Sequence, residues 1–251
     1  MNLRHILPLG GIDELEPLRS LALEAESVGV TTLLIEERPD SELDPVVTLA
    51  SFTEVAPSIG LGIMLSAHSG RAPSVLAKLL SGLDLVTGGR AHLVIGEMSD
   101  LASEDLERIA EQVGLITEML THDVTTLEGP NYRVDRAWNT PRMTFAPLVG
   151  DKVIVACSPA GFEQMTRVDQ ATAHSSVIVV DPSSWDRDAP MVERAIERST
   201  PEFVGAMVGI EGDLAAALGL SASIADRFSA VYLRWTVLPS PGDLARCAQA
   251  L

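Results

Sequence analysis

Hydrophobic and polar positions along this chain form a repeated two-part pattern. Each short run of consecutive apolar residues is followed by a longer segment in which apolar residues recur every three to four positions. Short uninterrupted runs are typical of strands buried on both faces, and the longer period is that of an amphipathic helix. The predicted strands are residues 3–9, 31–36, 59–66, 91–96, 152–157, 176–180, 203–210 and 230–238.

The predicted helices carry recognisable end signals. Gly29 follows the helix predicted over 14–28, and Gly88 follows the one over 73–87, which has Pro73 in its first turn. Glycine after a helix and proline at its start are the usual terminators. The other predicted helices are 43–56, 103–120 and shorter ones near 159–170, 188–198, 212–219 and 240–250.

Eight strands alternating with eight helices predict a parallel α/β fold. At 251 residues the repeat matches the typical length of a (β/α)8 TIM barrel, with one domain over 1–251. A doubly wound open sheet is the alternative, but no G-x-G-x-x-G follows the first predicted strand. Residues 124–143 interrupt the alternation, and the stretch around Gly129-Pro130 predicts a small hairpin.

Charge and cysteine content narrow the class of protein. The formal net charge of −17 would repel nucleic acid and anionic membranes, so an anionic ligand must be held by local groups against the global field. Cys157 and Cys247 are far apart and have no metal-ligand spacing, which favours a reduced, cytoplasmic protein. We find no signal-peptide core near the N-terminus and no apolar run of membrane-spanning length.

The strand ends direct attention to two candidate sites, because a barrel places its chemistry at the carboxyl ends of its strands. Ser158 follows a predicted strand and can cap a helix with Pro159 in its first turn. The exposed amides of such a start form an anion site, although an ordinary capped helix has the same signature. His68 lies just past the third strand and is a candidate acid–base group, or else a plain surface histidine. No metal-ligand set and no nucleophile elbow is present.

An ordered set of motifs resembles the bacterial luciferase-like family of flavin- or F420-dependent oxidoreductases. The set is GLGIMLS, a short loop, and RAPSVLAKLLSGLDLVTGGRAHLVIGE, with further likeness in ALEAESVGVTTLLIEERP, DPVVTLASF, LTHDVTTLEGPNYRV and KVIVACSPAG. The family fold is a (β/α)8 barrel, in agreement with the repeat count. Typical members are longer, so the resemblance implies trimmed insertions around the active site here.

The resemblance also implies site residues. Met64, Leu65 and Ser66 would lie beneath the flavin ring, and the phosphate would meet the loop of Cys157, Ser158, Pro159, Ala160 and Gly161. The pair Glu37-Arg38 stands where many members have Glu-His, and an arginine is not a general base near neutral pH. Arg38 could instead pair with Glu36, Glu37 or Asp40. Glu97 follows the fourth strand, where flavin-binding relatives carry an arginine, and a carboxylate there would repel a phosphate unless paired.

These features predict an oxidoreductase or monooxygenase that acts on a small organic substrate with reduced FMN or coenzyme F420. Glu37, Arg38 and His68 are the candidate catalytic residues, and relatives suggest a homodimer. Arg38 and Glu97 motivate an alternative, a degenerate barrel with an accessory, non-catalytic role that binds flavin or no cofactor. An unrelated barrel hydrolase or lyase is a third hypothesis.

Overall fold

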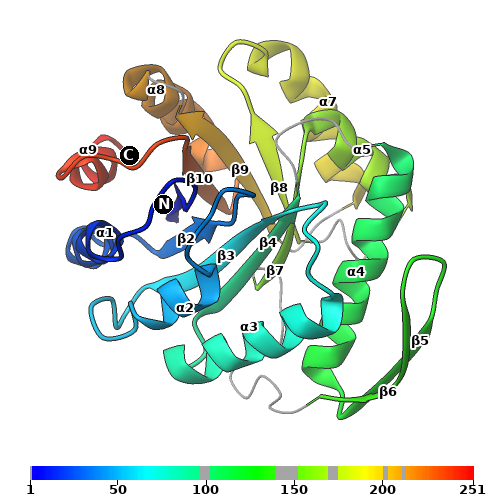
Figure 1. Cartoon of the computed structure of the whole chain (residues 1–251). Coiled ribbons are helices and arrows are strands. Elements are labelled where there is room, and N and C mark those ends of the chain that lie inside the picture. Colours follow the sequence, from blue (N-terminus) through cyan, green and yellow to red (C-terminus); the bar gives the residue numbers. More distant parts are fainter. Residues whose placement is uncertain (1, 97–101, 140–151, 169–174, 200–202, 211–212) are drawn as a thin grey trace.

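The computed structural model describes residues 2–96, 102–139, 152–168, 175–199, 203–210 and 213–251 (Figure 1). Eight parallel strands close into a barrel in the order β1-β10-β9-β8-β7-β4-β3-β2. They are β1 (Leu3–Pro8), β2 (Thr32–Glu36), β3 (Gly60–Ser66), β4 (Ala91–Gly96), β7 (Val153–Cys157), β8 (Ser175–Val180), β9 (Phe203–Ile210) and β10 (Ala230–Trp235). The predicted (β/α)8 barrel is confirmed, and the closed order excludes the open doubly wound sheet.

Helices surround the barrel and connect its strands (Figure 1). They are α1 (Glu16–Val28), α2 (Pro45–Ala50), α3 (Pro73–Thr87), α4 (Ser103–Thr121), α5 (Pro159–Val168), α7 (Trp185–Ser199), α8 (Leu214–Ile224) and α9 (Asp243–Ala250), with a 3-10 turn η1 (Ala225–Arg227) after α8. Gly29 and Gly88 end α1 and α3 with φ of 77° and 70°, in the left-handed region that favours glycine. Both predicted helix ends are therefore confirmed.

Several helices differ from their predicted extents, among them α8, expected near 212–219, which runs on to Ile224. The helix expected over 43–56 is shorter, since α2 begins at Pro45 after the Asp44 cap and gives way at Ser51 to turns. There the Ser51 hydroxyl donates to the Thr48 carbonyl at 2.6 Å, a local bond that competes with regular helix. The helix expected from 188 begins earlier, at Trp185, and Pro190 lies within its early turns.

Glycines make room for large side chains inside the barrel. A Cβ atom on Gly60 would lie 2.7 Å from the His92 ring, and one on Gly205 would lie 2.8 Å from the Tyr232 ring. The interior cluster includes Ile6, Leu34, Met64, Val94, Ile154, Val177, Met207 and Tyr232, each contributed by a different strand. Because side chains alternate along a strand, these positions establish which neighbours also face the barrel axis.

The loop that joins α3 to β4 is held by backbone contacts. The Arg90 guanidinium donates to the carbonyl oxygens of Ala56, Ile59 and Thr87. Asp84 is buried and accepts from the backbone N–H of Ala91 at 3.3 Å. Carbonyl groups at the ends of neighbouring elements thus satisfy this arginine in place of a carboxylate.

The predicted hairpin is confirmed outside the barrel. Strands β5 (Val124–Glu128) and β6 (Arg133–Trp138) pair antiparallel and project beside α4 (Figure 1). Glu111 on α4 anchors the turn, because its carboxylate accepts from the backbone N–H groups of Asn131 and Tyr132 at 3.0 Å each. In the described part of the chain, no helix combines the length and apolarity needed to cross a membrane.

Candidate active site

The carboxyl ends of the eight strands meet at one mouth of the barrel. Alternation from Leu34 and Met64, which face the axis, places Glu36 and Ser66 on the same inward side. Arg38 follows β2, and its guanidinium reaches back to Glu36. Parallel strands bring their ends to the same edge, so β2, β3 and β10 together build one side of this mouth. This side carries most of the predicted catalytic residues.

Glu36 forms a charged cluster at this mouth. The Arg234 guanidinium donates from Nη2 to Oε1 at 2.6 Å and from Nε to Oε2 at 3.1 Å. Arg38 adds a longer contact, Nη2 to Oε2 at 3.4 Å. The side chains of Glu36 and Arg234 are only 12% and 14% exposed. The alternative in which Arg38 pairs with a neighbouring carboxylate is confirmed, with Glu36 as its partner.

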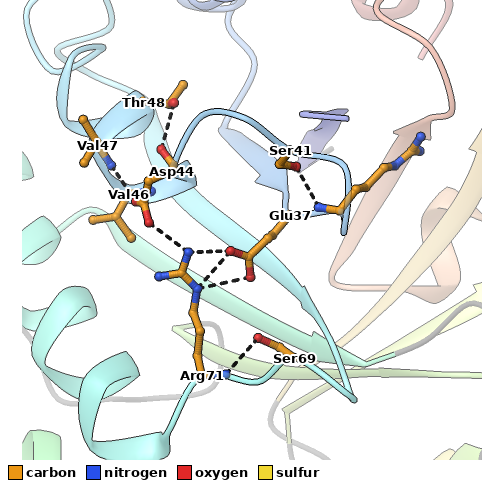
Figure 2. A network of polar contacts seen from close by, with 9 residues as sticks. Glu37, Ser41, Asp44, Val46, Val47, Thr48, Ser69 and Arg71 are labelled. Atoms are coloured by element: carbon orange, nitrogen blue, oxygen red, sulfur yellow. Dashed lines mark hydrogen bonds and ion pairs between the residues drawn. The ribbon is translucent and has the colours of Figure 1, made fainter. Parts of the chain in front are cut away.

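A second network fixes the loops after β2 and β3 (Figure 2). Arg71 donates from Nε to both carboxylate oxygens of Glu37, at 3.0 and 3.2 Å, and from Nη2 to Glu37 and Asp44. The Glu37 hydrogen bond is the main reason why the pKa of Arg71 is raised. Burial alone would raise the pKa of Asp44, but the Arg71 hydrogen bond and the backbone N–H groups of Val47 and Val46 outweigh burial and lower it.

A cavity of about 750 Å³ opens between these loops. It is lined by Glu37, Arg38, Pro39, Ser41, Glu42, Leu43, Asp44, Ser66, His68, Ser69, Gly70 and Arg71. All three predicted catalytic residues, and Ser66 of the predicted cofactor residues, therefore share one cavity. Its volume is within the range of small-molecule sites.

Glu37 lies in this cavity but is committed to Arg71. Both of its oxygens accept hydrogen bonds from that guanidinium, so the carboxylate is already occupied by a charged partner. Glu37 therefore acts through Arg71, which ties the loop after β2 to the β3–α3 loop and to Asp44, the cap of α2.

His68 is at the rim of the cavity and is 59% exposed. Its Nδ1 lies 3.2 Å from Nη2 of Arg108, which also donates from Nη1 to the Ala67 carbonyl at 2.8 Å. A guanidinium has only donors, so this contact requires Nδ1 to accept and places the hydrogen of the neutral ring on Nε2. Nδ1 also lies 3.8 Å from Asp105. His68 is therefore an oriented side chain on the mouth.

The remaining residues of β3 divide between two environments. Met64 belongs to the interior cluster, whereas Leu65 belongs to the cluster between the sheet and the helices. Ser66 accepts a hydrogen bond from the His68 backbone N–H at 3.0 Å. Met64 and Ser66 thus face the side of the sheet where a ligand on the barrel axis would lie.

The loop after β7 has the predicted cap. Ser158 Oγ accepts from the Gly161 backbone N–H at 3.1 Å and opens α5 at Pro159. The first-turn amides, such as that of Ala160, have no helical carbonyl to bind. Cys157 points instead between sheet and helices, and burial raises the pKa of its thiol to about 12. Pro159 has no N–H and the Gly161 N–H is bound to Ser158, so the Ala160 amide is the first-turn donor left for an anion, while the Cys157 thiol is buried away from the mouth.

Sequence reasoning missed Arg234 and Arg71 as site residues. Arg234 interrupts the apolar run predicted as a strand over 230–238, and this charged position inside the run was the available signal. Arg71 lies in the predicted β3–α3 loop, where nothing local shows that it meets Glu37. Glu97 lies outside the described residues. Among the residues that the model describes, no group of three or more His, Cys, Asp or Glu side chains could hold a metal ion.

Comparisons with known proteins place this barrel in a family. The family model described as "Luciferase-like monooxygenase" matches residues 4–198. The chain therefore belongs to the luciferase-like monooxygenase family, and the resemblance seen in its motifs is confirmed. No curated protein sequence matches it significantly.

Several solved structures share the fold at low sequence identity. Monooxygenase RslO1 from Streptomyces bottropensis is 16% identical, with a TM-score of 0.70 over 100% of this chain and 96% of that one. The coenzyme F420 dependent tetrahydromethanopterin reductase from Methanopyrus kandleri is 15% identical, with a TM-score of 0.67. The match covers 100% of this chain and 82% of the reductase chain. The oxygenating constituent of 3,6-diketocamphane monooxygenase from Pseudomonas putida, in complex with FMN, is 13% identical, with a TM-score of 0.58. The match covers 82% of this chain and 67% of the monooxygenase chain.

Proposed function

We propose that this chain is a flavin-dependent oxidoreductase or monooxygenase that acts on a small organic substrate with reduced FMN or coenzyme F420. Its membership of the luciferase-like monooxygenase family carries the proposal. The cavity at the carboxyl ends of the barrel strands supports it, since this is where TIM barrels hold their ligands. Both an F420 dependent reductase and an FMN-bound monooxygenase share the fold.

The residues present fit such a cofactor at two places. The capped start of α5, with Ser158 and the Ala160 amide, offers donors for a phosphate. Met64 and Ser66 offer a partly apolar wall for a ring. When bound, the reduced cofactor supplies the electrons for oxygenation or hydride transfer. The chain's part is to orient it and exclude water, and His68 lines the cavity as a candidate hydrogen-bonding group.

Titration with FMN and with F420, followed by absorbance and fluorescence, tests the proposal. Saturable binding of either cofactor with a shifted spectrum is the expected result. No binding of either at high micromolar concentration would refute it. That outcome favours the accessory, cofactor-free barrel, which the commitment of Glu37 to Arg71 already motivates.

The phosphate site has its own test. Ser158→Asp places a carboxylate at the start of α5 and should weaken cofactor binding about tenfold or more through like-charge repulsion. Ser223→Asp is the charge-matched control, because Ser223 is exposed near the end of α8, away from the mouth. Unchanged affinity in Ser158→Asp would remove the phosphate assignment.

We further propose that the chain forms a homodimer through α2 and α3. These helices expose four apolar side chains, Val47, Val75, Leu85 and Val86, at 48–70% of their surface. Light scattering after gel filtration should report a dimer, and Val86→Asp should shift it toward the monomer. Leu23→Asp, at an exposed position on α1, is the control. A monomeric wild-type protein at micromolar concentration would overturn this proposal.

A further inference from the structure

The charges at the barrel mouth do not balance around Arg38. Glu36 has a bidentate partner in Arg234, at 2.6 and 3.1 Å, so its charge is already compensated. Arg38 meets the same carboxylate only through one contact of 3.4 Å. Two guanidinium groups therefore share one carboxylate, and the cluster carries a net charge of +1 in a protein of net charge −17.

The Arg38 side chain is weakly held, although its backbone is fixed. Its Nη1 donates to the Thr236 carbonyl at 3.3 Å, and both of its side-chain contacts are at the long end of hydrogen-bond geometry. Its backbone N–H donates to Ser41 Oγ at 3.0 Å. The side chain is 27% exposed and lines the 750 Å³ cavity. Its other N–H groups have no partner within the described ranges, so they remain available to a ligand.

The other charged residues around the mouth do not compete for this role. Arg71 is shared between two carboxylates, Glu37 and Asp44, and has no surplus charge to offer. A cavity of about 310 Å³ at the ends of β8 and β9 is lined by Asp181 and Asp213, which disfavour an anion. The larger cavity also carries the carboxylates of Glu37, Glu42 and Asp44, of which Arg71 binds Glu37 and Asp44. Among its described lining residues, Arg38 is the guanidinium left to meet an anion.

The position of Arg38 also separates it from the proposed phosphate site. Arg38 follows β2, whereas Ser158 follows β7, and β3 and β4 lie between those strands in the barrel. With two intervening strands about 4.8 Å apart, one phosphate group cannot reach both sites. An anion at Arg38 would therefore be a different group from the cofactor phosphate, and we assign it to the substrate.

We propose that Arg38 is a specificity-determining residue that binds a carboxylate or sulfonate group of the substrate. A planar guanidinium with free N–H groups binds such anions through paired hydrogen bonds. An anionic ligand would offer Arg38 closer hydrogen bonds than the present 3.4 Å contact with Glu36. Arg38 can therefore turn from Glu36 to the ligand, because Arg234 still neutralises the Glu36 carboxylate. The substrate class of the proposed oxidoreductase is then organic acids.

Calorimetric binding of matched acids and amides tests this inference without any cofactor. The probes are phenylacetate, octanoate and succinate, each paired with its neutral amide. The wild-type protein should bind at least one acid about tenfold more tightly than its amide. Arg38→Met and Arg38→Gln should abolish that preference, whereas Arg133→Met, an equal charge change on a side chain 77% exposed, should keep it.

Several outcomes overturn the inference. One is equal binding, or no binding, of acid and amide in all three pairs. Another is an acid preference that survives in both Arg38 variants. If Arg38 were only a strut between β2 and β10, its variants would lower the unfolding temperature and leave the preference unchanged. Weaker FMN binding in Arg38→Met, with no change for the acids, would assign Arg38 to the cofactor. Failure of FMN and F420 to bind would refute the redox function alone.

Discussion

Glu36 and Arg234 form a bidentate ion pair that joins β2 to β10 across the intervening β1, at distances of 2.6 and 3.1 Å. The two residues are 198 positions apart in sequence, and both are nearly buried at the mouth of the barrel. The pair therefore adds a side-chain link across the seam where the first and last strands, β1 and β10, pair through their backbones. It also releases the positive charge of Arg38 for other contacts.

Arg234→Met should destabilise the protein by about 3 kcal/mol, because it leaves the Glu36 carboxylate buried with only the weak Arg38 contact. Urea unfolding at pH 7 measures the change. The double variant Glu36→Leu/Arg234→Met should recover most of the loss, since no buried carboxylate is then left unpaired and the partly exposed Arg38 keeps its Thr236 contact. Additive losses in the double variant would contradict this account.

Arg71→Met should lower stability at neutral pH, and the difference from wild type should shrink as the pH falls below about 4. The folded pKa of Asp44 is depressed below its ordinary value of 3.8, so its stabilising contribution is present above that value. The contribution is lost as the pH falls through the folded pKa. Urea midpoints measured from pH 7 to pH 3 test this, with Arg133→Met as the exposed control. A difference that is independent of pH would contradict it.

His5 should make the wild-type protein less stable as the pH falls from about 6.5. Its ring is fully buried, accepts from Trp235 Nε1 at 3.0 Å, and has its pKa lowered by burial from 6.5 to about 3. Between these two values the unfolded chain binds a proton that the folded chain does not, so stability rises with pH. The His5→Gln variant should show a shallower dependence of the urea midpoint between pH 7.5 and pH 5. Identical slopes of the urea midpoint against pH in the two proteins would show that His5 does not control this pH dependence.

Gly96→Ala should destabilise the barrel by about 3 kcal/mol or prevent folding, because a Cβ atom there would lie 1.9 Å from the Ala156 carbonyl oxygen. The obstacle is backbone of the neighbouring β7 and cannot rotate away. Gly114→Ala is the control, since open space surrounds that position in α4 and alanine should stabilise the helix by about 0.5–1 kcal/mol. Thermal unfolding of both variants measures the effects. A neutral Gly96→Ala would mean that β4 and β7 separate at this point.

The sequence by itself determined the repeating elements and hence the barrel. Its signals are local: apolar runs mark strands such as β4, and Pro73 and Gly88 mark the ends of α3, because neighbouring residues decide backbone conformation. The cap at Ser158 was predictable for the same reason, since its hydroxyl acts on an amide three residues away. Family motifs also lie mostly within single βα units.

Only the tertiary structure decided which charged side chains meet. Arg234 and Glu36 lie far apart in the chain, as do Arg71 and Glu37, which are 34 positions apart. Their pairing depends on closure of the sheet and on how the β3–α3 loop folds back over β2, and no local propensity encodes either. An electrostatic contact depends on distance in space, and barrel closure sets that distance. The same closure brings Arg234 to Glu36 and so leaves the positive charge of Arg38 in surplus. No local sequence pattern shows this surplus.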